Sequence, residues 1–286
     1  QREILVRYQL TPVVYDLKTA EALNAFMIPT KKKLAIHIKV DTGMTRLGFP
    51  LPDFARACAA IKRLTFLEPA GLLTHLAEAG DGPFTTKQAK AFSQAKTIFE
   101  ETFSEGEPKG IFHIANSQAS IDGQVGEPGG ELMARFGIAL YGAYPLESSW
   151  KKIALKPVLS WKTKIIAVKD VPAKTAISYN RTYVTKKPSR IGIIPVGHAD
   201  GYPRLLSNRS SVLVRGRKVP VAGVVCMDLT MVDLTDVPQA AVGDEVVLIG
   251  RQGKMEIRAE ELATLAETIP YEILCRISER VTRVFV

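Results

Sequence analysis

Residues 37–50, HIKVDTGMTRLGFP, place a lysine inside a segment with the pattern of a buried strand. Burying an ammonium group is costly unless the group is paired with an opposite charge or chemically altered. Asp41 follows Lys39 by two residues, and Arg46 follows it by seven. One interpretation is an ion pair between Lys39 and Asp41. The other is a lysine with a chemical role, and it needs further motifs to support it.

A second group of residues has the types that bind an anion. In RFGIALYG (135–142), Gly137 lets a bulky ligand approach the backbone closely, because glycine has no Cβ. The N–H groups of Gly137 and Ile138 can donate to a phosphate, as loops after late barrel strands often do. Ser117, in HIANS, and Tyr271 add two hydroxyl groups. The alternative is a strand end with a tight turn.

Arg135 and Tyr179 have side chains suited to other roles. A guanidinium group cannot be deprotonated and offers only hydrogen-bond donors. A phenol, whose pKa is near 10, is a poor base at neutral pH unless nearby cations lower that pKa. The structural alternatives are a buried Arg135 paired with a carboxylate and an ordinary strand tyrosine at position 179.

The elements that must position these residues differ between the two halves of the chain. In the first half, strand-like runs alternate with helical patterns, which predicts βαβ units and a parallel sheet. The strand-like runs are 13–17, 33–41, 69–76, 110–117 and 132–142, and the helical patterns are roughly 18–27, 51–63 and 85–104. In the run 33–41, the even positions from Leu34 to Val40 are apolar, whereas His37, Lys39 and Asp41 form a polar face.

A polar face on a covered parallel strand fits a closed barrel with an active site at its carboxyl end. About five strand–helix units precede residue 145, whereas a closed βα barrel has eight. At ~30 residues per unit, three further units amount to roughly 90 residues. We therefore expect an incomplete (β/α)8 TIM-type barrel that lacks its first strands.

The second half has short β-branched runs separated by Gly and Pro, which predicts a mainly antiparallel β domain. Residues 215–218 and 251–254 read as hairpin turns. Residues 259–277 predict a helix that stops at Pro270, with a second short helix as an option, and TRVFV (282–286) predicts a last strand.

From these element patterns we expect a partial barrel domain over 1–149 and a β-rich domain over 150–286.

The composition sets limits on the partners of the protein. The 286 residues carry a net charge of +9, but Lys and Arg are spread along the chain, which favours a solvated basic surface or an anionic ligand over nucleic acid. Three cysteines without zinc spacing, and the lack of an apolar run long enough for a membrane span, favour a cytoplasmic protein with neither a metal site nor a membrane partner.

Eight motifs in order give the chain a family resemblance from residue 37 to 286. They are HIKVDTGMTRLGF, LLTHLAEAG, HIANSQAS, RFGIALYG, ISYNRTYV, VGHADGYPR, VVCMD and PYEILCRISERVTRVF. The chain resembles alanine racemase, a fold-type III pyridoxal-phosphate enzyme. The resemblance implies a pyridoxal phosphate cofactor, two-base interconversion of L- and D-alanine that supplies D-alanine for peptidoglycan, and a homodimer with active sites shared between subunits.

The resemblance also implies residue roles. Tyr179 is the second catalytic base and reaches the cofactor of the other subunit, with His75 and Arg135 behind it as the groups that lower its pKa. Arg135 faces the pyridine nitrogen. Arg46 contacts the phenolic oxygen of the cofactor and the substrate, and Met227 binds the substrate carboxylate across the dimer.

For the cofactor phosphate, the resemblance implies four residues: Ser117, Gly137, Ile138 and Tyr271. For Lys39 it implies carbamylation by carbon dioxide, which would convert the cation into an anion able to pair with Arg46. The unmodified Lys39 paired with Asp41 stays open as the alternative.

The chain departs from the family pattern in three places. His198 stands where the family usually has Tyr in a GYADGY motif, and Val224 replaces an arginine usual just before CMD. Two other positions, by contrast, follow the pattern, since Ile269 and Arg204 match residues lining the substrate access channel. The third departure is an absence. The KADAYGHG-like stretch that carries the family's cofactor-binding lysine does not occur in the chain. We therefore expect an amino-terminally truncated racemase that is inactive as this piece alone.

Two alternatives remain open from the sequence. One is a related racemase for serine or a basic amino acid, since His198 and Val224 lie where such a change would show. The other is a non-catalytic pyridoxal-phosphate-binding barrel protein. Such single-domain barrels lack a second β domain, whereas residues 150–286 retain the motifs of one, including Tyr179.

Overall fold

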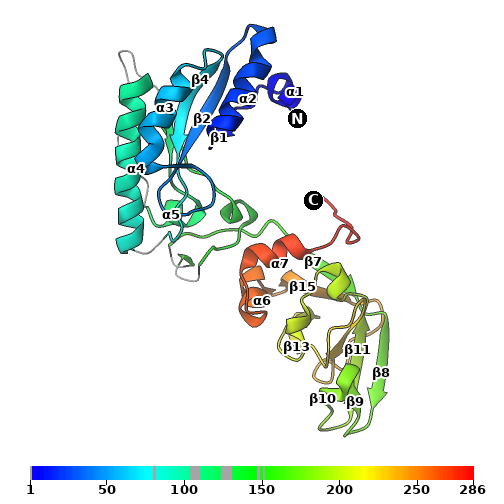
Figure 1. Ribbon diagram of the computed structural model, residues 1–286. Coiled ribbons are helices and arrows are strands. Elements are labelled where there is room, and N and C mark those ends of the chain that lie inside the picture. Colours follow the sequence, from blue (N-terminus) through cyan, green and yellow to red (C-terminus); the bar gives the residue numbers. More distant parts are fainter. Residues whose placement is uncertain (1, 80–81, 104–109, 124–130, 147–148, 151) are drawn as a thin grey trace. The chain divides into compact units, whose positions relative to one another are not determined.

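The computed structural model describes residues 2–79, 82–103, 110–123, 131–146, 149–150 and 152–286 (Figure 1). The chain divides into two compact units, Gln1–Gly137 and Ile138–Val286. Each unit has its own sheets and its own hydrophobic core. A domain boundary after residue 149 stays a prediction.

The first unit is built on a parallel sheet with the strand order β1-β2-β4-β5-β6, and β3 also pairs with β2. The strands are β1 (Val13–Val14), β2 (Leu34–Asp41), β3 (Phe49–Pro50), β4 (Leu67–Leu73), β5 (Ile111–His113) and β6 (Glu131–Leu132). The helices are α1 (Arg2–Arg7), α2 (Leu17–Met27), α3 (Phe54–Lys62), α4 (Gly82–Phe103) and α5 (Ser117–Ile121), with short 3-10 turns at Ile28–Thr30 and Leu51–Asp53. The predicted strand–helix alternation is therefore confirmed.

Strand β2 has the predicted two-faced pattern. Ile36, Ile38 and Val40 are fully buried, while His37 and Lys39 on the other face are each 9% exposed. The apolar face lies in a core with α2, α3 and α4, and α4 packs along α3 (Figure 1). Both faces of β2 are therefore covered, and its polar side chains lie inside the unit.

The last strand of this unit is shorter than predicted. The strand expected over 132–142 is limited to β6, and a 3-10 helix occupies Ile138–Tyr141. Arg135 makes only an isolated parallel bridge to Asn116. The N–H groups of Met133 and Arg135 still donate to Phe112 and Ala115, so backbone pairing ends only after Arg135. The Arg135 side chain lies among the backbone carbonyls of neighbouring strand ends.

The second unit is antiparallel, as predicted. Its sheets have the orders β14-β11-β8, β10-β9 and β13-β12-β15-β16, with β7 on β15. The strands are β7 (Trp161–Lys164), β8 (Ala167–Val171), β9 (Ala176–Ile177), β10 (Tyr183–Val184), β11 (Ser189–Ile194), β12 (Ser211–Val214), β13 (Arg217–Pro220), β14 (Thr230–Asp233), β15 (Glu245–Gln252) and β16 (Met255–Ile257). The helices are α6 (Ala259–Leu265) and α7 (Pro270–Arg276), with 3-10 turns at Tyr179–Arg181, His198–Asp200 and Arg204–Leu206.

Three local predictions for this unit can be compared with the structure. Hairpins join β12 to β13 and β15 to β16 at the predicted turns, where Arg215, Gly216 and Gly253 have positive φ. The helix predicted from 259 breaks before Pro270, which begins α7. The last strand predicted over 282–286 is wrong, because this segment pairs with no strand.

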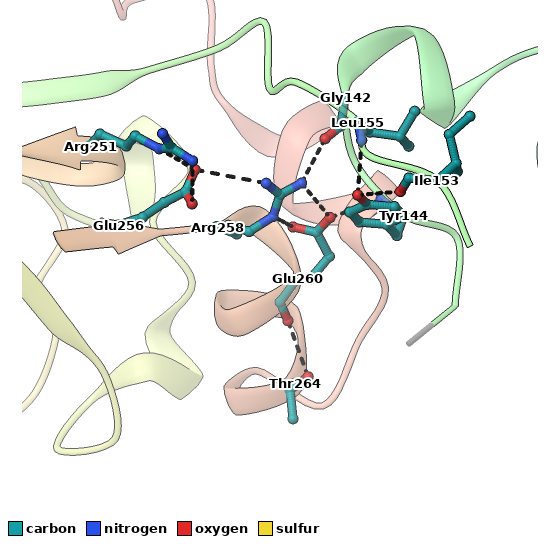
Figure 2. A network of polar contacts seen from close by, with 9 residues as sticks. All are labelled: Gly142, Tyr144, Ile153, Leu155, Arg251, Glu256, Arg258, Glu260 and Thr264. Atoms are coloured by element: carbon teal, nitrogen blue, oxygen red, sulfur yellow. Dashed lines mark hydrogen bonds and ion pairs between the residues drawn. The ribbon is translucent and has the colours of Figure 1, made fainter. Parts of the chain in front are cut away.

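A buried ion-pair network fixes the start of the second unit (Figure 2). Arg258 donates to the backbone oxygen of Gly142 at 2.8 Å and pairs with Glu260 at 3.3 Å. Glu260, only 6% exposed, also accepts the backbone N–H of Tyr144 at 2.8 Å. Because the carboxylate is hydrogen-bonded as well as paired, its burial is compensated. The network therefore ties the segment around residues 142–144 to the start of α6.

None of the helices in the described ranges is both long and apolar enough to cross a membrane.

Gly48 allows the chain to turn back against the end of β2. Its φ is +134°, and a Cβ at this position would lie 2.6 Å from the backbone nitrogen of Asp41. We expect Gly48→Ala to lower the free energy of unfolding by about 3 kcal/mol, because it adds backbone strain and a backbone clash. Urea unfolding measures the change. Gly82→Ala is the control, since a Cβ there meets nothing within 4 Å. Equal effects of the two changes would contradict the prediction.

Candidate active site

Cationic side chains gather at the carboxyl end of β2. Lys39 lies on the polar face of β2, Arg46 lies on the loop after it, and Arg135 follows β6. Burial lowers the pKa of Lys39, the charges of Arg46 and Arg135 lower it further, and the charge of Asp41 raises it. The lysine therefore lies in surroundings that disfavour its protonated form.

Asp41 is engaged elsewhere. One of its carboxylate oxygens accepts the N–H of Gly43 at 2.9 Å and the N–H of Thr45 at 3.0 Å. In the described parts of the chain, no ion pair joins Asp41 to Lys39. Asp41 therefore orders the turn after β2, and the simple ion pair is not what the structure shows.

Arg135 is anchored by main-chain oxygens. Its guanidinium group donates to the carbonyls of Thr74 at 2.6 Å, His113 at 2.9 Å and Ile114 at 3.3 Å. Two imidazoles accept further N–H groups, through Nδ1 of His113 at 3.0 Å and Nδ1 of His75 at 3.3 Å. Among the described residues, no carboxylate pairs with Arg135, so its charge is uncompensated.

The contacts with Arg135 fix the tautomers of the two histidines. Because arginine only donates, Nδ1 of each imidazole accepts, and a neutral ring then carries its proton on Nε2. Nε2 of His113 donates to Nδ1 of His37 at 2.8 Å. Burial and the Arg135 charge lower the pKa of His75 to about 4 and that of His113 to about 3. Both rings are therefore neutral at pH 7, and Nε2–H of His75 is available as a donor.

The candidate phosphate residues of the first unit are adjacent. Ser117 begins α5 and is 3% exposed, and its Oγ accepts the N–H of Gly137 at 2.8 Å. A Cβ on Gly137 would meet only this Oγ, at 3.9 Å, so one side of the glycine is open. Ile138 and Tyr271 belong to the second unit, where Ile138 is buried and Tyr271 lies on α7. Burial raises the pKa of Tyr271.

Tyr179 and Met227 come together in the second unit. With Ser178, Cys226, Asp228, Leu229 and Met231 they line a cavity of about 510 Å³. Both side chains are exposed, Tyr179 by 67% and Met227 by 60%. Ser178 and Asn180, on either side of the tyrosine, have positive φ values of 65° and 57°. Oγ of Ser178 donates to the backbone oxygen of Val224 at 2.8 Å, which ties the two cavity-lining segments together.

The structure also locates the two positions that depart from the family pattern, His198 and Val224, and the two channel positions that match it, Ile269 and Arg204. The N–H of His198 donates to the backbone oxygen of Cys226 at 2.9 Å, and its side chain is exposed. Val224 is 7% exposed, so the valine packs inside the unit. Ile269 is the N-cap of α7 and is 55% exposed, and Arg204 begins a 3-10 turn.

The structure thus brings Lys39, Arg46, Arg135, His75, Ser117 and Gly137 together in one unit and Tyr179 with Met227 in the other. Sequence reasoning missed the roles of His113 and His37. His113 is the last residue of β5, where a polar residue is a signal of function, and His37 lies in the middle of β2. Sequence reasoning also missed Gln88, on α4, which is fully buried. Its only sequence signal is a polar residue on the apolar face of a helix.

The fold and this basic site define a class, namely proteins with a βα-barrel-like domain and a carboxy-terminal β domain. Family models for the alanine racemase N-terminal domain and C-terminal domain match residues 1–145 and 158–285. The chain therefore belongs to the alanine racemase family, and the fold class predicted from the sequence is confirmed.

Individual relatives agree. An alanine racemase of Halothermothrix orenii is 45% identical over 285 residues, covering 99% of this chain and 74% of that protein. Alanine racemase 2 of Caldanaerobacter subterraneus is 40% identical, covering 98% and 72%. Among solved structures, alanine racemase of Clostridium difficile 630 has a TM-score of 0.86 at 34% identity, covering 98% of this chain and 72% of that one. The enzyme from D-cycloserine-producing Streptomyces lavendulae has a TM-score of 0.88 at 32% identity, covering 96% and 72%.

The neutral histidines predict a pH dependence of stability. Their folded pKa values lie below the ordinary 6.5, so their contribution is present above pH 6.5 and is lost as the pH falls toward about 4 for His75 and 3 for His113. We expect His113→Gln to flatten the decline in the free energy of unfolding between pH 6.5 and 4, measured by urea titration at several pH values. His198→Gln, at an exposed position, should follow the wild-type curve. Parallel curves for His113→Gln and wild type would disprove the prediction.

Proposed function

We propose that the racemase to which this chain belongs, complete with the family's cofactor-binding lysine, performs the pyridoxal-phosphate-dependent racemisation of alanine, as part of D-alanine supply for peptidoglycan. The observation that carries the proposal is the 45% identity to an alanine racemase over 99% of the chain. The basic cluster agrees with it, because an anionic cofactor would balance charge that the described residues leave uncompensated.

The residues present fit the cofactor. The proposed phosphate ligands are Ser117, the N–H of Ile138, Tyr271 and the N–H of Gly137, which would exchange its present bond to Oγ of Ser117 for one to the phosphate. When bound, pyridoxal phosphate supplies the electron-withdrawing system that makes the Cα–H bond of an amino acid acidic. The open side of Gly137 gives a bulky anion access to the backbone.

Arg135 would face the pyridine nitrogen. Because it offers only donors and stays charged, it keeps that nitrogen unprotonated. A neutral pyridine withdraws electrons from Cα less strongly than a protonated one. This favours rapid return of the proton to Cα over transamination. The main-chain carbonyls that bind Arg135 hold the guanidinium group for this role.

Tyr179 would hold or release the proton on one face of Cα, with its phenol oxygen as the reacting atom. A phenol needs stabilisation of its anion to act at neutral pH. Nε2–H of His75 is the donor suited to it, because Nδ1 of that ring is occupied by Arg135 at 3.3 Å. We infer a homodimer in which Tyr179 and Met227 act at the active site of the other subunit.

Lys39 is proposed to be carbamylated. Burial and neighbouring cations raise the fraction of neutral amine, which is the form that attacks carbon dioxide. The amine loses one proton as the N–C bond forms, and the product is an anion. That anion would pair with Arg46, orient it toward the phenolic oxygen of the cofactor and the substrate, and remove the cost of a buried, unpaired ammonium group.

We place the protein in the cytoplasm. Cys58, Cys226 and Cys275 are free thiols, as expected of a reducing compartment.

A side-by-side turnover assay tests the substrate. We expect alanine to be racemised well ahead of serine and lysine by the full-length holoenzyme, measured by chiral separation of the products. Preferred turnover of serine or lysine would replace alanine with the alternative substrate that the His198 and Val224 departures leave open. No turnover of any amino acid by the full-length protein would refute the racemase proposal and favour a non-catalytic cofactor-binding protein.

Carbamylation has its own test. We expect ¹³C-labelled bicarbonate to give a protein carbamate signal in the NMR spectrum of the wild type. Lys39→Arg should abolish the signal, because a guanidinium group keeps the charge but does not form the carbamate. A second change, Lys33→Arg, acts at an exposed lysine just before the same strand and should leave the signal unchanged. A wild type without the signal would contradict the modification.

A further inference from the structure

Gln88 is a buried amide with every partner assigned. The residue lies on α4 and is 0% exposed. Its Nε2 donates to Oγ1 of Thr42 at 3.1 Å and to the backbone oxygen of His75 at 3.0 Å. Its Oε1 accepts the N–H of Ala77 at 2.9 Å. Both donors and the acceptor are therefore used in directions that a carboxylate or an apolar side chain cannot reproduce.

These contacts join the ends of two neighbouring strands. Thr42 directly follows β2, and His75 and Ala77 follow β4 by a few residues. Thr42 also hydrogen-bonds to Thr74 through their hydroxyl groups at 2.8 Å. The backbone oxygen of Thr74 in turn accepts from Arg135 at 2.6 Å. One glutamine thus lies at the centre of the contacts that place both the His75 backbone and the Arg135 anchor.

The packing around Gln88 leaves little room for rearrangement. A Cβ on Gly43 would lie 3.0 Å from the Phe84 ring and 3.7 Å from Cγ of Gln88. The first turns of α4 therefore lie directly against the loop after β2. Thr85, on the same helix, holds a later point of the β4–α4 loop through a 2.5 Å hydrogen bond to the backbone oxygen of Glu78.

We propose that Gln88 is a positioning residue, which holds the His75 imidazole against Arg135 through the backbone of residues 75–77. It touches none of the atoms that would react. The placement of the His75 ring by Gln88 is argued from the contacts above. The effect of Gln88 on turnover rests on the proposed racemase function.

The first test is the titration of His75, followed by NMR in the chain without cofactor. The charged groups facing this imidazole are Arg135, Arg46 and Lys39, and with burial they hold its pKa at about 4. In Gln88→Met the loop is released, so water enters and the ring moves from Arg135. We expect the pKa of His75 to rise toward its ordinary value of 6.5.

Two matched variants separate positioning from general stabilisation. Thr85→Val removes a hydrogen bond to the same loop and should lower the melting temperature without moving the His75 titration. Gln94→Met makes the same substitution at an exposed position of α4 and should change neither. An unchanged His75 titration in Gln88→Met, or an equal shift in Thr85→Val, overturns the proposal.

Gln88→Asn serves if Gln88→Met does not fold, because the amide one methylene shorter stays polar and adds no charge beside His75, while its donors and acceptor are drawn away from Thr42, His75 and Ala77. The expected upward shift of the His75 pKa is the same. If this variant folds with the titration unchanged, the proposal is equally overturned.

The second test uses the full-length holoenzyme. Misplacement of a catalytic group by a fraction of an ångström to an ångström lowers turnover by about 10- to 100-fold. We expect this loss in kcat for Gln88→Met, with a displaced pH profile and with cofactor content retained by absorbance. An unchanged kcat and pH profile, in an enzyme that racemises, overturns the catalytic consequence. A wild type without racemase activity refutes the proposed function instead, and the His75 titration then still decides the positioning role.

Discussion

The site depends on a guanidinium group that is held inside the protein and has no acidic partner among the residues that the structure describes. Arg135 reaches the ends of β4 and β5 at once, because its acceptors are the carbonyls of Thr74, His113 and Ile114. The carbonyl of His113 also accepts the N–H of Thr74 at 3.2 Å, and a carbonyl oxygen has a second lone pair that can accept a further donor. The arginine donates to all three carbonyls, and the carbonyls satisfy the arginine. The positive charge itself remains for a ligand to balance.

Burial and this uncompensated charge act together on the ionisation of the neighbouring groups. Burial, supported by the charge of Arg135, lowers the pKa values of His75, His113 and Lys39, which keeps the two imidazoles neutral and disfavours the protonated form of the lysine. A carboxylate close to Arg135 would oppose all three effects, because it would favour protonated imidazoles and a charged amine. The only acidic group that acts on Lys39 is Asp41, which is committed to the turn after β2 within the described residues. Charge and geometry therefore both favour the neutral amine of Lys39, the form that the proposed carbamylation requires.

Local pattern predicted the elements but not the contacts between them. The alternation in β2, the hairpins and the break at Pro270 follow from near neighbours in sequence, and each is confirmed. The strand expected over 282–286 is wrong because β-branched composition does not supply a pairing partner. The strand expected over 132–142 ends early because its backbone pairing stops at Arg135, whose N–H donates to Ala115, and a 3-10 helix then occupies Ile138–Tyr141.

Family motifs indicated candidate site residues, but they did not indicate which residues far apart in the sequence contact each other. Gln88 meets a threonine 46 positions away, and His37 meets a histidine 76 positions away. Neither spacing has a periodic signature along the chain, so only the folded structure shows the pairs.

The choice of main-chain acceptors for Arg135 has a consequence for the tolerance of the site to mutation. A carbonyl oxygen belongs to every residue type, so replacing the side chain at 74, 113 or 114 leaves the acceptor in place. An anchor built from aspartate or glutamate would be lost by a single codon change at any of its members. Here only a change at 135 itself removes all the main-chain bonds together. Neighbouring positions can therefore drift in sequence while the guanidinium group keeps its place.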